Sequence, residues 1–187
     1  MAEALAAAGR PVLLTREPGG SPGAEALRAL LLAGAPGFAP EAETLLHFAA
    51  RADHVARTIR PALAAGMWVV CDRFADSTMA YQGYGLDAER ADIAALTAMV
   101  RLCPDLTIVL DVSEAEAEAR LAARGARPDH YERLGRAFHA RVRAGFRAIA
   151  GAEPARCRLV DAAVSAAEVH SEVMRVVAAL IADNGGA

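Results

Sequence analysis

Four short apolar runs, separated by segments with helical periodicity, are the feature that most limits the fold of this chain. The runs cover residues 11–15, 67–70, 106–112 and 157–160, and they are rich in Val, Leu and Ile. Such runs are typical of strands buried on both faces of a parallel sheet. Because parallel strands join through right-handed crossovers, the intervening helices cover both faces. We therefore predict an α/β fold with three layers around a parallel sheet.

The segments between the runs carry the spacing and the end signals of helices. Ser-x-x-Glu at 113–116 and at 165–168 matches the capping box, which satisfies free N–H groups of the first helical turn. Asp87 is the expected cap of another helix, and Pro61 is expected to kink or break the longest one. The expected helices cover residues 1–8, 22–33, 41–65, 87–102, 113–124, 134–149 and 165–181. The expected buried stripe of the longest helix is Leu45, Phe48, Val55, Ile59 and Leu63.

The composition bounds the class of protein. A chain of 187 residues is long enough for one well-buried domain and short for two, so we expect a single domain over residues 1–187. The net charge of −3 gives no general attraction for a polyanion, which argues against a nucleic-acid partner. No apolar run reaches the roughly 18 residues of a membrane span. The three cysteines are odd in number and far apart, so we expect reduced thiols and a cytoplasmic location.

The chain contains no lysine, and all 20 of its basic Lys/Arg positions are arginine. This absence excludes every mechanism that needs a lysine amine, including a Schiff base and the lysine of a Walker A phosphate loop. Any anion binding must therefore come from local clusters of arginine.

The stretch at 71–83, CDRFADSTMAYQG, follows directly after the second apolar run. Ligands of open parallel sheets bind outside the carboxyl ends of the strands, so Asp72 and Arg73 are expected to face a ligand. The stretch also offers hydroxyl groups, an aromatic ring and an amide, which suit a nucleotide. These groups belong to Ser77, Thr78, Tyr81 and Gln82. The alternative interpretation is a salt-bridged loop with polar turn residues.

Two further segments carry candidate site residues. The loop TREPGGSPG at 15–23 places Arg16 and Glu17 at the carboxyl end of the first strand. On the longest helix, His47 and Arg51 share one face, although such residues beside an apolar stripe are more often snorkelling or capping side chains. The polar segment 124–136 contains four arginines and is either a mobile lid or a solvated connection between helices.

Taken in order, these motifs resemble bacterial thymidylate kinase. The resemblance is carried by TREPGG, LLHFAARADH, DRFADSTMAYQG, PDLTIVLDV and the arginine-rich segment before FHARVRAGF, and it extends over nearly all of the chain. It implies the fold of the P-loop nucleoside monophosphate kinases and transfer of the γ-phosphoryl group of ATP to dTMP, giving dTDP. It also implies Mg²⁺ and a homodimer.

The resemblance assigns roles to individual residues. Arg16 and Arg73 resemble the arginines that bind the dTMP phosphate, and Arg51 resembles the arginine that reads the base. Tyr81 resembles the ring that packs on the sugar and excludes a 2′-hydroxyl, and Asp72 resembles the acid near Mg²⁺. The expected dTMP-binding residues are Arg16, Glu17, His47, Arg51, Arg73, Ser77, Thr78, Tyr81 and Gln82, and the expected catalytic residues are Asp72, Arg73, Arg124 and Arg127. Phosphoryl transfer needs positioning and charge neutralisation rather than a covalent nucleophile, which suits these residue types.

The sequence departs from the family pattern at two places within the site. His47 stands where the family often stacks a phenylalanine on thymine, and an imidazole stacks there less tightly. The lid usually reads Asp-Arg-x-Glu, whereas here residues 129–132 read Asp-His-Tyr-Glu. We therefore expect Arg127 or Arg124 to supply the transition-state charge.

The family's first strand and its GxxGxGK[ST] phosphate loop are absent from the sequence. The GGSPG motif near Gly19 is a turn, since no Lys-Ser/Thr follows it. The absent strand would lie in the middle of the sheet. The favoured interpretation is a thymidylate kinase whose sequence starts late, through a misplaced start or a truncated gene. The alternatives are a non-catalytic dTMP-binding protein that lost its ATP site and a structural α/β domain.

The chain as printed is expected to transfer phosphoryl groups poorly, because it has neither the lysine nor the backbone cradle that aligns the β- and γ-phosphates. Binding of dTMP is expected to survive where transfer does not. The measurement is dTDP formation with ATP and Mg²⁺, by the chain expressed from Met1 and from an upstream in-frame start. Equal turnover of the two proteins would mean that other groups hold the phosphates.

Overall fold

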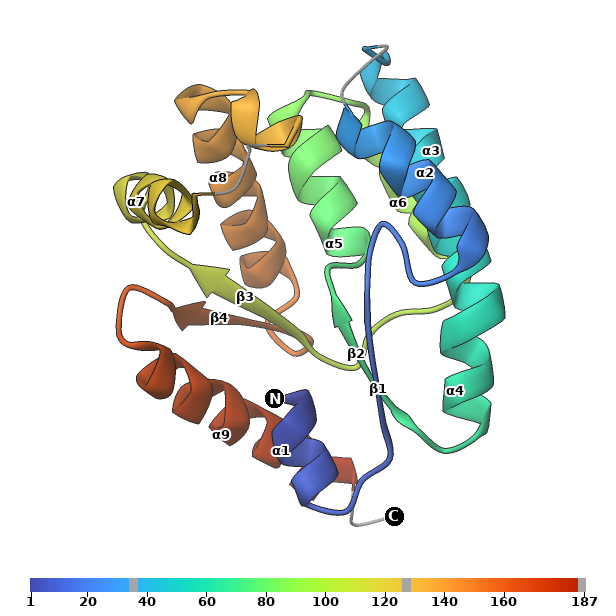
Figure 1. The fold of residues 1–187 in the computed structure, drawn as a ribbon, viewed down its shortest axis with the longest axis vertical. Coiled ribbons are helices and arrows are strands. Elements are labelled where there is room, and N and C mark those ends of the chain that lie inside the picture. The colour runs from blue at the N-terminus through green and yellow to red at the C-terminus, as the bar shows by residue number, and fades with distance from the viewer. Residues whose placement is uncertain (34–36, 126–128, 185–187) are drawn as a thin grey trace. The chain divides into compact units, whose positions relative to one another are not determined.

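The computed structural model describes residues 1–33, 37–125 and 129–184. The chain forms two compact units, the N-terminal unit of Ala2–Leu102 with Pro128–Gly145 and the C-terminal unit of Cys103–Arg127 with Phe146–Ala187. Figure 1 shows the helices and strands of both units. The single domain expected from chain length stays a prediction.

The N-terminal unit is built on two parallel strands, β1 (Val12–Arg16) and β2 (Trp68–Asp72). Their register pairs Val12 with Trp68 at one end and Arg16 with Asp72 at the other. The ladder extends one step further, because Glu17 N donates to the Asp72 carbonyl over 2.9 Å. The predicted strands are therefore confirmed, and both end at the same edge. Helices α1 (Ala2–Ala7) and α2 (Pro22–Ala33) flank β1 in the sequence, and both match the predicted ranges.

The long predicted helix is formed in three parts. These are α3 (Pro40–His54), the π-helical turn η1 (Val55–Ile59) and α4 (Arg60–Ala64). Within η1 the backbone N–H of Arg60 bonds the Val55 carbonyl, five residues earlier. Pro61 then lies in the first turn of α4, where its missing N–H is tolerated. The expected break at Pro61 is thus a widened turn just before the proline.

The expected buried stripe of this helix is partly wrong. Phe48, Val55 and Ile59 are buried and pack with Phe74 or Ile93, but Leu45 and Leu63 are 57% and 44% exposed. The inward face of α3 instead carries polar side chains, most of which pair with residues of other segments. Its buried residues are Glu43, Thr44, Phe48, Ala50, Arg51 and His54. Hydrophobic periodicity alone cannot identify such a face, because the pattern scores only apolar residues.

The segment after β2 is helical. It consists of α5 (Ala75–Thr78) and the π-helical η2 (Met79–Gly85), which together bury Thr78 and Gln82. Helix α6 (Arg90–Val100) follows, and the predicted cap at Asp87 is wrong, because the side chain of Glu89 accepts the bond from Ala91 N. Asp87 is in the left-handed region, with φ of 62°, so it belongs to the turn before the helix.

The C-terminal unit contains a second parallel pair, β3 (Thr107–Asp111) and β4 (Cys157–Asp161). Helix α7 (Glu114–Arg124) follows β3, and α9 (Ala166–Asn184) follows β4 and contacts it. The capping box at 165–168 is confirmed in both directions, because Ser165 Oγ accepts from Glu168 N and Glu168 Oε2 accepts from Ser165 N. At 113–116, Ser113 Oγ accepts from Glu116 N, which confirms Ser113 as the cap. Residues of α8 (Arg136–Ala152) belong to both units, and the short η3 (Tyr131–Arg133) belongs to the N-terminal unit.

Parallel pairing, the central fold prediction, is confirmed. Across the described residues, the strands form two separate two-stranded sheets, β1-β2 and β3-β4, rather than one hydrogen-bonded ladder. Within those same residues, no helix is both long and apolar enough to cross a membrane.

Gly20 is predicted to be indispensable for the turn that follows β1. Its φ is +82°, and an added Cβ would lie 2.5 Å from Thr15 Oγ1 and close to His54 Nε2. Gly9 is the control, because it has a similar φ of +77° and no atom within 4 Å of an added Cβ. Gly20→Ala should lower the free energy of unfolding by about 2 kcal/mol more than Gly9→Ala, since overpacking adds to backbone strain. Denaturant unfolding of both variants measures this difference, and equal losses would contradict it.

Candidate functional site

The carboxyl ends of β1 and β2 bring the two strand-end motifs together. Arg16 and Asp72 are register partners, and both side chains are exposed at this edge. Arg16 Nη2 donates to Glu25 Oε1 over 3.0 Å, and Glu25 also accepts from Gly20 N. These contacts orient Arg16 while leaving it half-exposed. The predicted positions of Arg16 and Asp72 at one sheet edge are therefore confirmed, whereas their roles stay predictions.

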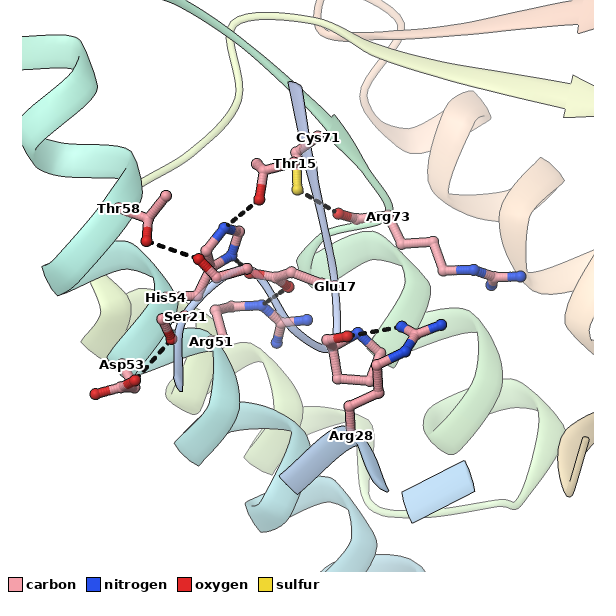
Figure 2. A network of polar contacts seen from close by, with 12 residues as sticks. Thr15, Glu17, Ser21, Arg28, Arg51, Asp53, His54, Thr58, Cys71 and Arg73 are labelled. Atoms are coloured by element: carbon pink, nitrogen blue, oxygen red, sulfur yellow. Dashed lines mark hydrogen bonds and ion pairs between the residues drawn. The ribbon is translucent and has the colours of Figure 1, made fainter. Parts of the chain in front are cut away.

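A buried ion pair joins the loop after β1 to helix α3. Arg51 Nε donates to Glu17 Oε2 over 2.8 Å, and the two side chains are 2% and 4% exposed. His54 Nδ1 lies 3.1 Å from the other carboxylate oxygen of Glu17, and His54 Nε2 lies 2.7 Å from Thr15 Oγ1. Figure 2 shows this chain of contacts between the strand end and the helix. Arg51 is thus not a snorkelling side chain, because its charged end is buried.

His54 is a site residue that the sequence analysis missed. It is 0% exposed and lies three residues after Arg51, so helical spacing places both on one face. That spacing could have identified it. Its ring holds Glu17 in position, and the carboxylate in turn holds Arg51.

The remaining groups of the Arg51 guanidinium extend toward α5. Nη2 donates to Thr78 Oγ1 over 3.0 Å, and the guanidinium carbon lies 4.7 Å from the Phe48 ring and 5.2 Å from the Phe74 ring. The third nitrogen, Nη1, is buried and has no hydrogen-bond partner among the described residues. A buried charged donor without a partner is costly, so this nitrogen indicates where an acceptor group of a ligand would bind.

Arg73 leaves β2 in a conformation that is unusual for its residue type. Its φ is 68°, in the left-handed region that favours glycine, and its carbonyl accepts from Cys71 Sγ. The Arg73 guanidinium lies 4.8 Å from the ring centroid of Tyr81 on η2. Backbone strain that surrounding contacts maintain is common at binding sites. Burial, together with the negative charges of Glu17 and Asp72, raises the pKa of the Cys71 thiol to about 12, so this cysteine stays protonated at neutral pH.

A second buried network surrounds Gln82. Its Nε2 donates to Glu43 Oε1 over 2.8 Å and reaches the Tyr131 hydroxyl over 3.3 Å. The Tyr131 hydroxyl donates to the same Glu43 oxygen over 2.8 Å and lies 2.8 Å from His47 Nε2. The Tyr131 ring also meets the Tyr81 ring edge-on, at 5.6 Å between centroids. The sequence therefore anticipated His47, Tyr81 and Gln82 but missed Tyr131, which contacts all three, and the Glu43 carboxylate.

The protonation of this network follows from its surroundings. Burial, and the positive charges of Arg51 and Arg73, lower the pKa of His47 to about 3, so its imidazole is neutral at pH 7. Burial and the Glu43 carboxylate raise the pKa of Tyr131, so its phenol keeps its proton. The network thus holds one carboxylate, with neutral groups directed at it.

Not every expected residue joins these networks. Ser77 is half-buried, and its backbone N–H bonds the Phe74 carbonyl. Arg124 ends helix α7, but its side chain lies outside the described part of the chain, and so does the whole of Arg127. No cluster of three or more metal-ligating side chains occurs within the described residues.

Comparisons with known proteins agree on one family. The family model described as thymidylate kinase matches residues 1–173. A thymidylate kinase of Gluconobacter oxydans is 49% identical over 181 residues, covering 95% of this chain and 85% of the relative. A thymidylate kinase of Pseudomonas syringae pv. tomato is 50% identical over 184 residues, covering 97% of this chain and 87% of the relative. The crystal structure of thymidylate kinase from Ehrlichia chaffeensis has a TM-score of 0.70 and 36% identity, covering 89% of this chain and 79% of that one.

The neutral state of His47 predicts a pH dependence of stability. A histidine has a pKa of about 6.5 in the unfolded chain, against about 3 in the folded protein. The contribution of His47 to the free energy of unfolding is therefore fully present above about pH 6.5. It is lost as the pH falls toward 3, because only the unfolded state takes up the proton. Because glutamine does not titrate, His47→Gln should make the fall of the unfolding free energy with decreasing pH shallower by up to about 1.4 kcal/mol per pH unit. Denaturant unfolding between pH 7 and 5 measures the slope, with the exposed His170→Gln as the control. Equal slopes for all three proteins would contradict a neutral His47.

Proposed function

The chain belongs to the thymidylate kinase family, and from this premise we propose that the N-terminal unit holds the dTMP site of the family's reaction. That reaction transfers the γ-phosphoryl group of ATP to dTMP and gives dTDP. The attacking nucleophile is an oxygen of the dTMP phosphate, so the protein's task is to hold and orient the two nucleotides.

The observation that carries the proposal is the unpaired, buried Nη1 of Arg51. Thymine presents a carbonyl oxygen that can accept this bond, and the base would thereby satisfy a donor that the protein leaves unpaired. Thr78 and Gln82 lie on the same side of α5 and η2 and would contact the same base edge. The neutral imidazole of His47 would stack against the base in place of the phenylalanine of other family members.

Arg16 and Arg73 would bind the dTMP phosphate. Their support is position: both lie at the carboxyl ends of paired parallel strands, where ligands of such sheets bind. A guanidinium matches two phosphate oxygens at once, which fixes the orientation of the group as well as its place. Tyr81, whose ring already contacts the Arg73 guanidinium, would pack on the sugar and leave no room for a 2′-hydroxyl.

Mg²⁺ fits the residues at this edge. Asp72 offers an exposed carboxylate, and Mg²⁺ typically binds one or two carboxylates together with substrate phosphates and water. Asp72 would hold the ion, which neutralises phosphate charge when bound. Arg124 and Arg127 would supply further positive charge to the transferring group, in keeping with the arginine-rich composition of 124–136.

We also propose a cytoplasmic homodimer. The family resemblance supports both features, and the three free cysteines, Cys71, Cys103 and Cys157, fit a reducing compartment. A second candidate function, a dTMP-binding protein without kinase activity, is favoured by the absence of lysine from the 187 residues. The turnover assay with ATP separates the two functions, because both bind dTMP and only one forms dTDP.

Arg73→Ala should weaken dTMP binding by about 1.5 to 3 kcal/mol, the scale of a charged hydrogen bond to an anion. Arg90→Ala is the matched control, because the Arg90 guanidinium also lies 4.8 Å from a tyrosine ring, that of Tyr84, but not at a strand end. Isothermal titration calorimetry with dTMP measures both variants. Loss of affinity in the control alone, or in neither variant, would remove Arg73 from the phosphate site.

A further inference from the structure

The proposed dTMP site contains a buried carboxylate, Glu43, to which the roles above assign no task. Glu43 is 4% exposed on helix α3, and its Oε1 accepts from both Gln82 Nε2 and the Tyr131 hydroxyl, each over 2.8 Å. The second oxygen, Oε2, lies 3.8 Å from His130 Nε2. Burying a carboxylate is costly unless hydrogen bonds replace its water, and the chain provides such bonds at Glu43, which indicates a specific use.

The chemistry of these partners fixes the orientation of the Gln82 amide. An ionised carboxylate only accepts hydrogen bonds, so it must receive the NH₂ side of the amide. The Tyr131 oxygen reinforces this orientation, because its own proton is directed at Glu43 and it therefore accepts from Gln82 Nε2. Gln82 is 1% exposed, so solvent does not compete for its NH₂ group. Both neighbours thus turn the amide oxygen away from the carboxylate.

A fixed amide oxygen distinguishes between pyrimidines. Thymine carries a proton on N3 and offers a donor there, whereas cytosine has a lone pair on N3 and offers an acceptor. An amide held with its oxygen toward the base accepts a hydrogen bond from N3 of thymine and repels the N3 lone pair of cytosine. An amide free to rotate would present its NH₂ group to cytosine and lose the distinction.

We propose that Glu43 is a positioning residue that sets base specificity by locking the Gln82 amide, with Tyr131 as the second part of the lock. This inference rests on the proposed dTMP site. Tyr131 lies on η3, 88 residues from Glu43 in the sequence, so the lock joins the segment after 129 to helix α3. Through Tyr131, the arginine-rich segment 124–136 therefore contributes to base selection as well as to any contact with phosphate.

His47 completes the lock. Since the Tyr131 proton is directed at Glu43, the 2.8 Å contact between His47 Nε2 and the Tyr131 oxygen requires a proton on Nε2. The neutral state of His47 is consistent with this arrangement, because a second positive charge beside Arg51 would be unfavourable. Gln82 Nε2 and the Tyr131 hydroxyl thus donate to Glu43, and Gln82 Nε2 and His47 Nε2 donate to the Tyr131 oxygen.

The test compares dTMP with 5-methyl-dCMP, which keeps the methyl group, sugar and phosphate and changes only the 3,4-edge of the base. Calorimetry on the full chain gives the ratio of the two affinities. Glu43→Gln keeps the side-chain volume but offers both a donor and an acceptor, so the Gln82 amide becomes free to rotate. The preference for dTMP should fall by about tenfold, the effect of one wrongly oriented buried hydrogen bond. Glu41→Gln, the same change at an exposed position of the same helix, should leave the ratio unchanged.

Each outcome decides between the proposals. If the unchanged protein binds dTMP and Glu43→Gln keeps the wild-type ratio, the lock is refuted while the dTMP site stands. If the unchanged protein does not bind dTMP, the proposed site itself fails, and the lock fails with it.

Should Glu43→Gln not fold, as judged by circular dichroism, Tyr131→Phe decides. It removes the longer of the two bonds from Gln82, and it should lower the ratio in the same direction by a smaller factor. An unchanged ratio in that variant would overturn the lock.

Discussion

The ion pair between Arg51 and Glu17 is the interaction on which the site depends. Both charges are removed from water, and such a pair is favourable only where the geometry is good and most of the remaining polar atoms are also bonded. Glu17 meets this condition through His54, which is itself tied to Thr15 on β1. Removing one partner would leave a buried charge alone, which costs more than the pair contributes. The strand end, helix α3 and the end of α5, which Thr78 joins to Arg51, are therefore held as one arrangement.

The sequence predicted the regular elements well, because local signals determine them. The apolar runs gave β1 to β4, the Ser-x-x-Glu pattern gave the starts of α7 and α9, and the strand-end rule placed Arg16 and Asp72 together. The failures have two causes. On α3 the site replaces an apolar stripe by paired polar side chains, so the apolar pattern assigned Leu45 to the core and overlooked Glu43. The cap at Glu89 was missed because the preceding turn places Asp87 in the left-handed region.

The contacts within the site were the least predictable part. Glu43 meets Tyr131 across 88 residues, and Arg51 meets Thr78 across 27, distances at which sequence spacing gives no geometric information. Residue types narrowed the choice to groups suited to a nucleotide, and the family resemblance assigned them to parts of dTMP. Only the fold shows that a carboxylate joins Gln82 to Tyr131 in the arginine-rich segment. Only the fold shows, too, that one guanidinium nitrogen of Arg51 is left without a partner among the described residues.

The π-helical turn η1 has a consequence for the whole length of the helix that contains it. A regular α-helix advances by about 100° of rotation per residue, so one additional residue in a single turn shifts the phase of everything beyond it. Before the turn, the inward face presents Arg51 and His54 to the site. After it, α4 buries Ala62 and contacts β2. The helix therefore serves a polar site at one end and contacts the sheet at the other, and the two ends are joined by a turn that is one residue longer than an α-helical turn.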